Sequence, residues 1–193
     1  MNLARRILLS MCAGTLICCS AFAQDSADRF YQAIRNDNLG VLRSMAVGTA
    51  VNTADRHGTT PLMDAAAFGS TDAVQLLLDR GADPNAKNAF GATALMWAAG
   101  DMEKVRLLVA KGADVNARSN IGRTPLSIAV LYDGSFEIAR LLIEKGADAT
   151  ARDKLGVTVL QAAAQGNDVR LRCVYCSRMA ATRKRRMGLE RLP

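Results

Sequence analysis

The stretch GTTPLMDAAAFGSTDAVQLLLDRGADPN, residues 58–85, decides the fold of this chain. It opens on a glycine, passes through Thr-Pro-Leu at 60–62 into an alanine-rich and then a leucine-rich segment, and closes on Gly-Ala-Asp at 81–83. A threonine is a good helix N-cap because its hydroxyl accepts an orphan backbone N–H, and proline is tolerated at the first helical position. Glycine suits the left-handed residue that ends a helix. The stretch therefore predicts two short helices joined by a turn.

The same pattern recurs along the chain at a nearly constant period. Its opening glycine, Gly58, returns as Gly91, Gly122 and Gly156, at spacings of 33, 31 and 34 residues. Its closing Gly-Ala-Asp returns at 112–114 and at 146–148. A helix pair of this size cannot bury its apolar faces alone, so such units are stable only when they stack on their neighbours.

These co-registered copies resemble the ankyrin repeat over roughly residues 28–169. The resemblance implies an all-α solenoid of helix-turn-helix units with β-hairpin loops. It also implies a concave face, formed by the hairpins and first helices, on which a protein partner binds. The chain departs from the family where a histidine usually follows Thr-Pro-Leu, since it carries Met63, Met96, Ser127 and Gln161 there. Because that histidine supplies a side-chain hydrogen bond, we expect a less rigid stack.

The repeat positions predict four parts. These are a signal peptide at 1–23, a degenerate N-terminal capping repeat at 24–57, three full repeats with an incomplete fourth at 58–169, and a basic tail at 170–193 that we expect to be disordered. Residues 30–34 and 39–42 predict a helix pair in the capping repeat. The second repeat is two residues short around Gly100, and the third has an extra residue near Asp133, which predicts a local bend.

The N-terminus has the three-part layout of a secretory signal. A basic start precedes an apolar run at 7–22, and Ala21 and Ala23 supply the small side chains that a signal peptidase selects. We therefore expect cleavage after Ala23 and a periplasmic or secreted mature chain. A membrane anchor is one alternative, although the run is shorter than the ~20 residues that span a bilayer. A lipoprotein is another, although the residues before Cys18 and Cys19 are not the usual small ones.

The C-terminal segment 170–193 does not complete the fourth repeat. The second helix should carry two adjacent apolar residues, but Leu171 is followed by Arg172, and no Gly-Ala-Asp closes the unit. The segment then runs into four basic residues at 183–186. Three interpretations stay open: an extension without special chemistry, a reading-frame disruption near residue 170, and a basic segment that contacts an anionic membrane or an acidic partner.

The charge of the chain is concentrated in this tail. The formal net charge of the whole chain is +7, but residues 24–169 carry 15 basic and 17 acidic side chains. Residues 170–193 carry eight basic side chains and one acid. The repeats are therefore close to neutral, and the overall basicity is a weak argument for nucleic-acid binding, which we do not expect.

Two groups of residues raise the question of catalysis. Cys173 and Cys176 have the spacing of a thiol-disulfide redox motif, but the sequence has no βαβ pattern to support one, and the pair is only half of a zinc site. His57 has no serine, cysteine or carboxylate arranged around it, which favours an exposed loop residue. We predict no catalytic, cofactor-binding or metal-binding residues; a thiol-disulfide oxidoreductase stays the enzymatic alternative.

The candidate partner-binding residues lie at the hairpin tips and at the ends of the first helices. The residue before each repeat glycine would form a row along the stack, and exposed apolar rows commonly mark contact surfaces. The alternative is that these side chains fold back on the neighbouring tip. By contrast, we expect Trp97, Met63 and Met96 to pack in the core. The candidates are Arg56, His57, Phe68, Phe90, Ile121, Arg123, Leu131, Tyr132 and Leu155.

Together these features predict an exported, monomeric module that binds a protein partner and has no catalytic activity. A membrane-surface scaffold held by the basic tail is the second alternative, and membrane contact is expected only through that tail. The fold itself does not identify the partner, because function on such a scaffold depends on surface residues.

Overall fold

The computed structural model describes residues 29–46, 48–132 and 134–165, so the predicted signal peptide and basic tail lie outside the described residues. After a helix at 29–35, the elements are α2 (Leu39–Met45), the 3₁₀ helix η1 (Gly48–Asn52), α3 (Pro61–Phe68), α4 (Thr71–Asp79), α5 (Ala94–Trp97), α6 (Met102–Ala110), α7 (Pro125–Ala129), α8 (Phe136–Glu144) and α9 (Val159–Gln165). The helix pair predicted before the first clear repeat is present.

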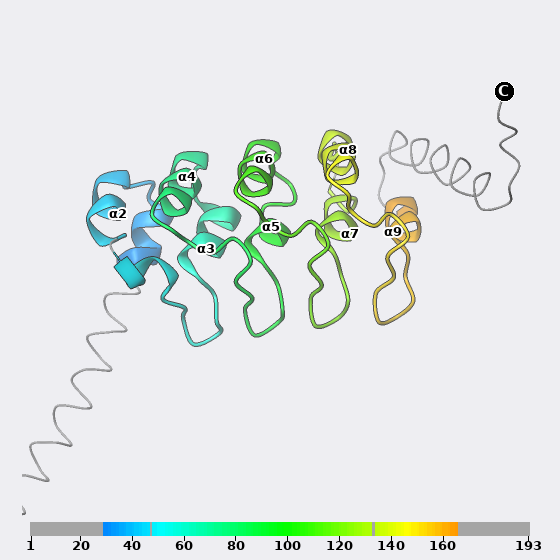
Figure 1. The fold of residues 1–193 in the computed structure, drawn as a ribbon, viewed down its shortest axis with the longest axis horizontal. Coiled ribbons are helices and arrows are strands. Elements are labelled where there is room, and N and C mark those ends of the chain that lie inside the picture. The colour runs from blue at the N-terminus through cyan, green and yellow to red at the C-terminus, as the bar shows by residue number, and fades with distance from the viewer. Residues whose placement is uncertain (1–28, 47, 133, 166–193) are drawn as a thin grey trace, which may run out of the picture.

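The helices stack as repeated pairs (Figure 1). The first helices α3, α5, α7 and α9 contact one another in sequence, and the second helices α4, α6 and α8 form a parallel row. Between successive units the chain makes a hairpin that projects from the first helices on the side away from the second helices (Figure 1). The all-α solenoid with hairpin loops is confirmed; within the described residues the hairpins form only one isolated antiparallel bridge, between Arg152 and Thr158.

Threonines begin the first helices, as predicted, with one exception. The hydroxyls of Thr60, Thr124 and Thr158 each accept the backbone N–H three residues on. Thr93 occupies the same N-cap position, but its buried Oγ1 has no hydrogen-bond partner among the described residues. The Met96 N–H donates to the Thr93 carbonyl, as the Met63 N–H does to the Thr60 carbonyl.

Two of the residues that replace the family histidine still make side-chain hydrogen bonds at the helix start. Ser127 Oγ accepts the Thr124 N–H at 2.9 Å, and Gln161 Oε1 accepts the Thr158 N–H at 2.8 Å. Both make the reciprocal bond of a capping box, in which two orphan donors are satisfied at once. The expectation that these substitutions remove the side-chain hydrogen bond is therefore wrong at Ser127 and Gln161, whereas Met63 and Met96 pack in the core as expected.

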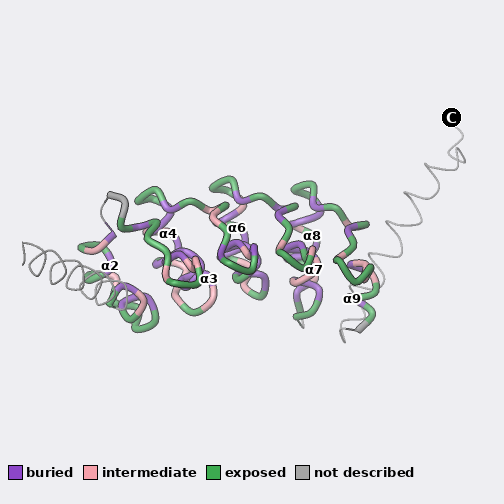
Figure 2. The backbone as a smooth tube through the Cα atoms, turned by 90° about the horizontal axis from the view of Figure 1, so that it is seen from below, coloured by how far each residue is buried: buried purple, intermediate pink, exposed green. Residues whose placement is uncertain are grey.

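One apolar core runs through the whole stack. The inward residues of the second helices, such as Leu77, Leu108 and Leu142, are fully buried, and small alanines let the first helices approach closely. Figure 2 shows buried positions recurring in each unit, with exposed residues along the hairpins. No helix among the described residues is long and apolar enough to cross a membrane.

An asparagine ladder joins each unit to the next on the side of the helix ends. Asn52, Asn85 and Asn116 each donate from Nδ2 to the carbonyl of the next helix-ending glycine, and each accepts the N–H of the aspartate two residues beyond that glycine. Thr150 takes the asparagine position in the following unit, and its hydroxyl bonds Asp148 within its own turn. The Gly-Ala-Asp and asparagine positions thus specify the contact between neighbouring units.

Candidate protein-interaction surface

Each hairpin is closed by a polar side chain that bonds its own backbone. Asp55, Asn88 and Asp153 each accept two backbone N–H groups through Oδ1, from the residues two and four positions later, at 2.8–3.0 Å. Ser119 holds the third hairpin by accepting the Arg123 N–H. Such Asx turns fix the tip conformation locally. Our sequence analysis missed them, although Asp or Asn stands three residues before the repeat glycine in three of the four hairpins.

Backbone hydrogen bonds join the tips of neighbouring hairpins. The carbonyls of His57, Phe90 and Ile121 accept the N–H groups of Ala89, Asn120 and Lys154 at 2.8, 2.9 and 2.9 Å. The residue before each repeat glycine therefore occupies the same place in every hairpin. We call His57, Phe90, Ile121 and Leu155 the tip row.

After three of the four tip residues, at Gly58, Gly91 and Gly122, glycine is required by close approach as well as by conformation. Gly91 has φ +69°, and a Cβ added there would lie 2.6 Å from Asn120 Oδ1 and 2.8 Å from Asn120 N. Gly58 and Gly122 lie in the same way against the backbone of the following hairpin. A side chain at these positions would force the hairpins apart, so glycine is what permits the bonds between tips.

The side chains of the tip row point into solvent. Phe90 is 66% exposed, Ile121 55% and Leu155 86%, and His57 is also exposed. Of the two arrangements that the sequence left open, the exposed row is the one found, and the side chains do not fold back. Three large apolar side chains thus lie in a row along the stack and are exposed to solvent.

A second exposed group lies where the first helices end. Phe68 is the last residue of α3, and Leu131 and Tyr132 follow α7; all three are exposed, as predicted. The ring of Tyr132 packs over Gly100, where an added Cβ would lie 3.3 Å from the ring. The short second repeat, which lacks a side chain at Gly100, therefore makes room for this tyrosine.

Trp97 belongs to this surface and not to the core. It is 42% exposed at the end of α5, so the prediction that it fills the core is wrong. Counted from the N-cap threonine, Trp97 occupies the position of Asp64 in α3 and Ile128 in α7. Asp64 is buried and Ile128 is half-buried at this position, so a comparison of the repeats gives no signal that Trp97 is exposed.

The first of these positions holds a buried carboxylate tied to the capping repeat. Asp64 is 95% buried, and its Oδ1 accepts a hydrogen bond of 3.0 Å from the guanidinium of Arg35. That bond raises the pKa of Arg35 above its ordinary value, and the guanidinium also lies 5.2 Å from the centre of the exposed Phe68 ring. Within the part of the chain that the structure describes, Asp64 Oδ2 has no hydrogen-bond partner. Phe68 is therefore held in place by a cation from the neighbouring unit.

The second helices bury one cation. Lys104 in α6 is buried, with Nζ 3.4 Å from the Ala66 carbonyl and 3.7 Å from Asp101 Oδ2. Its register position holds Ala73 in α4 and Ile138 in α8, so the lysine replaces an apolar core residue. The Ala66 carbonyl is near the end of α3, where the helix dipole favours a positive charge.

The predicted basic residues at the hairpins are exposed. Arg56 donates from Nε to Nε2 of the adjacent His57 at 3.1 Å, and Arg123 follows Gly122 in the third hairpin. His57 thus contacts Arg56 through its ring and the carboxylate of Asp55 through its backbone N–H. Within the described residues, no cluster of three or more His, Cys, Asp or Glu side chains is arranged to hold a metal ion; Cys173 and Cys176 lie outside this part of the chain.

Two family models match the chain. One describes ankyrin repeats in three copies and matches residues 82–153; the other describes ankyrin repeats in many copies and matches residues 48–96. Together they cover more than half of the sequence. The chain belongs to the ankyrin-repeat family.

Relatives match over short stretches of much longer proteins. A transient receptor potential cation channel subfamily A member 1 homolog of Caenorhabditis elegans is 42% identical over 67 residues, 34% of this chain and 6% of the channel. The human ankyrin repeat domain-containing protein 63 is 46% identical over 52 residues, 27% of this chain and 14% of that protein. Zygote-specific protein 3 of Chlamydomonas reinhardtii is 35% identical over 116 residues, 42% of this chain and 31% of that protein. The chain thus spans less than a third of each.

The names of these relatives describe a cation channel homolog, an ankyrin repeat domain-containing protein and a zygote-specific protein, and they state no common activity. Ankyrin repeats mediate protein–protein interaction, and the family is typically non-catalytic. The ankyrin stack of this chain is therefore a protein-interaction module, and its particular surface residues determine what it contacts.

Proposed function

We propose that the stack binds a protein partner through its tip row and through the exposed residues at the ends of the first helices, without catalysing a reaction. The observation that carries the proposal is the alignment of Phe90, Ile121 and Leu155 by backbone bonds between hairpins, with their side chains in solvent. Exposed apolar side chains lower solubility, and rows of them mark contact surfaces. Rigid presentation lowers the entropy lost on binding.

The helix-end residues extend the same contact area. Phe68, Trp97 and Tyr132 are aromatic, and aromatic side chains are enriched among the residues that dominate binding energies. Arg56 and Arg123 add exposed charges at the hairpins. The binding surface we propose is thus apolar and aromatic along the stack, with basic residues beside it.

Affinity capture with matched variants tests this proposal. The tagged full chain, a Phe90→Ser/Ile121→Ser/Leu155→Ser variant and a Val41→Ser control are expressed in the native host, and co-purifying proteins are identified by mass spectrometry. Val41 is an exposed apolar residue of α2, away from the hairpins. We expect a partner that the native chain and the control both capture and the folded triple variant loses. A partner that all three forms capture equally would mean that the contact lies elsewhere.

We also propose that the module works outside the cytoplasm, after cleavage behind Ala23. The support is the basic, apolar and small-residue sequence of positions 1–23. N-terminal sequencing of the protein from the envelope fraction is expected to begin at Gln24. A chain that retains Met1 and stays in the cytoplasmic fraction would contradict export and leave the proposed binding surface untouched.

A further inference from the structure

The charges of the stack are divided between its hairpins and its second helices. The segments 70–80, 101–111 and 135–145, which hold the second helices, carry six basic and six acidic side chains. The hairpins with their flanking residues, 53–60, 86–93, 117–124 and 151–158, carry six basic side chains and two acidic ones. The six are Arg56, Lys87, Arg118, Arg123, Arg152 and Lys154.

The two carboxylates at the hairpins are already engaged. Asp55 and Asp153 each accept two backbone N–H groups in their Asx turns. On the second helices, by contrast, Lys111 pairs with Asp79 at 2.9 Å and Arg140 with Glu144 at 2.9 Å. Among the described residues, none of the six hairpin cations forms an ion pair. The four hairpin segments therefore keep a formal excess of four positive charges, and one of their cations, Arg118, also interacts with the carboxylate of Asp148 beside its hairpin.

Three of these cations form an ordered line, which we call the basic row: Lys87, Arg118 and Arg152. Lys87 Nζ donates to the Arg118 carbonyl at 3.4 Å, Arg118 Nη1 to the Arg152 carbonyl at 3.0 Å, and Arg152 Nη1 to the Gly156 carbonyl at 3.2 Å. Each arginine has five N–H donors, so one such bond leaves most of the guanidinium available to a carboxylate.

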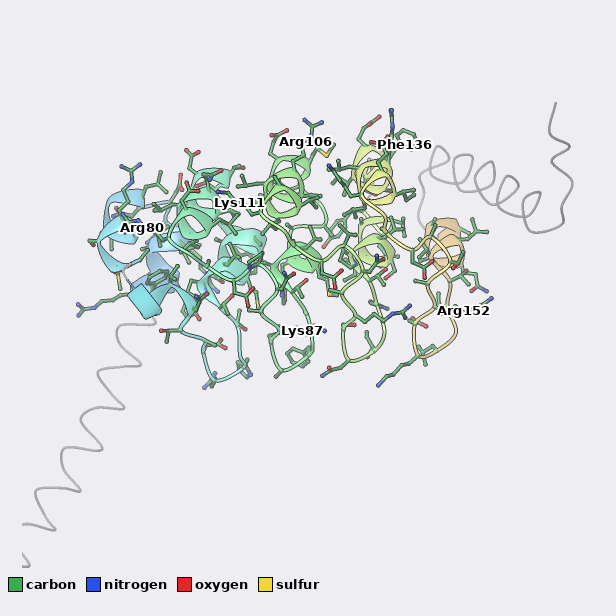
Figure 3. The ribbon with its side chains drawn as sticks, in the orientation of Figure 1. Arg80, Lys87, Arg106, Lys111, Phe136 and Arg152 are labelled. Carbon is green, nitrogen blue, oxygen red and sulfur yellow. The ribbon has the colours of Figure 1, made fainter. Side chains whose placement is uncertain are left out.

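The basic row and the tip row have the same register. Lys87, Arg118 and Arg152 each stand three residues before Phe90, Ile121 and Leu155, so every one of these hairpins offers one cation and one apolar side chain. Lys87 and Arg152 lie partway along their hairpins, between the tips and the helices (Figure 3). The two rows run along the stack together.

We infer that the partner contacts these rows with an extended acidic peptide segment, in which carboxylates recur together with apolar side chains. The inference rests on the proposed function and specifies the chemistry of the partner. Carboxylates match the guanidinium fork in bidentate pairs, and apolar side chains match Phe90, Ile121 and Leu155. Lys87 and Arg152 lie back from the hairpin tips, on which a flat membrane surface would rest (Figure 3). The tip row offers a nucleic acid only the rings of His57 and Phe90 on which to stack a base.

Selection of peptides on the full chain tests this inference. A displayed library of random peptides, long enough to cross three hairpins, is selected on the immobilised full chain, and an enriched peptide is synthesised for titration. We expect enrichment of Asp and Glu beside apolar residues, and an affinity that falls as salt rises. A Lys87→Gln/Arg118→Gln/Arg152→Gln variant should bind about tenfold more weakly or worse, since three exposed charge contacts are lost.

A matched variant separates this effect from total charge. Arg43→Gln/Arg106→Gln/Lys145→Gln removes the same charge from exposed positions away from the hairpins, in α2, in α6 and at the end of α8. This variant should bind like the native chain. Thermal unfolding of both variants shows whether the stack is intact. Equal weakening by the two variants would overturn the inference.

Other outcomes separate the chemistry from the surface. One such outcome is that peptides without acidic residues bind the native chain and do not bind the Phe90/Ile121/Leu155 serine variant. That result would overturn the inference of an acidic partner and would still support the proposed function. Tighter binding to phosphatidylserine vesicles or to a single-stranded oligonucleotide than to any selected peptide, lost in the basic-row variant, would assign the row to that ligand and also overturn the inference.

Discussion

The hairpin at 88–92 and the hairpin at 153–157 are built alike and differ in what lies beside them. In both, an Asx turn holds the tip and the repeat glycine has positive φ, 69° at Gly91 and 78° at Gly156. Gly91 lies against Asn120 of the following hairpin, whereas a Cβ at Gly156 would have no atom of the described residues within 4 Å. The comparison separates what a hairpin's own sequence specifies from what its neighbour requires.

The largest expected effect comes from alanine at these two glycines. Gly156→Ala places an alanine in the left-handed conformation, which lowers the free energy of unfolding. The smaller entropy of the unfolded alanine chain offsets part of this loss and leaves about 1 kcal/mol. Gly91→Ala adds a collision with Asn120 and should reduce the free energy of unfolding by about 3 kcal/mol or more. Urea unfolding of the two variants measures the difference. Equal losses would show that the contact between hairpins contributes nothing.

The asparagine ladder provides the next comparison. Asn116 bonds the Gly146 carbonyl and the Asp148 N–H, whereas Thr150, at the same position one unit later, bonds only within its own turn. Asn116→Ala should cost about 1–2 kcal/mol, because two hydrogen bonds between units are lost.

Thr150→Ala is the matched control for that variant. It should lower the free energy of unfolding by no more than about 0.5 kcal/mol, since Thr150 is exposed. The urea midpoints of the two variants, compared at equal m-value, measure both losses of stability. A Thr150→Ala loss as large as that of Asn116→Ala would contradict a special role for the ladder.

The repeats were predictable because each cue is local and occurs several times. The helix-ending glycines, the capping threonines and the register of the tip row all follow from the pattern that begins at Gly58. The exposure of Phe90 and Leu155 did not follow from it, because whether a tip folds back depends on backbone bonds between hairpins. Those bonds join residues about one repeat apart, and no local signal reports them.

The residues whose environment did not follow from the repeat pattern differ from one unit to the next. α5 is four residues long, barely one turn, so periodicity could not decide which way Trp97 points. Thr93 has the sequence of a cap, but its hydroxyl has no hydrogen-bond partner among the described residues. The burial of Lys104 depends on Ala66 in the preceding unit, a contact that a repeat consensus does not contain.

A smaller effect is expected from the tips themselves. Ile121 is about half buried, so Ile121→Ser should cost about 1 kcal/mol, whereas Leu155→Ser should cost close to zero because that side chain is almost fully exposed. Thermal unfolding measures both. A Leu155→Ser loss as large as that of Ile121→Ser would mean that Leu155 packs against the chain in solution and is unavailable to a partner.

The smallest effect concerns pH at the end of the ladder. The hydroxyl of Thr150 donates to Asp148 and lowers the pKa of that carboxyl below its ordinary 3.8, with smaller contributions from the Thr150 N–H and the charge of Arg118. Because the folded state holds this proton less tightly than the unfolded state, the resulting stability is present above pH 3.8. It is lost as the pH falls through the lowered value.

Thr150→Ala removes the main cause and should raise the pKa of Asp148 toward 3.8, which carboxyl NMR titration measures directly. The variant should then lose less stability than the native chain on acidification, although solvent screening keeps the difference small because Asp148 is exposed. An unchanged Asp148 titration in Thr150→Ala would mean that Arg118 and the backbone determine the carboxyl. Thr150 would then replace the ladder asparagine without any electrostatic role of its own.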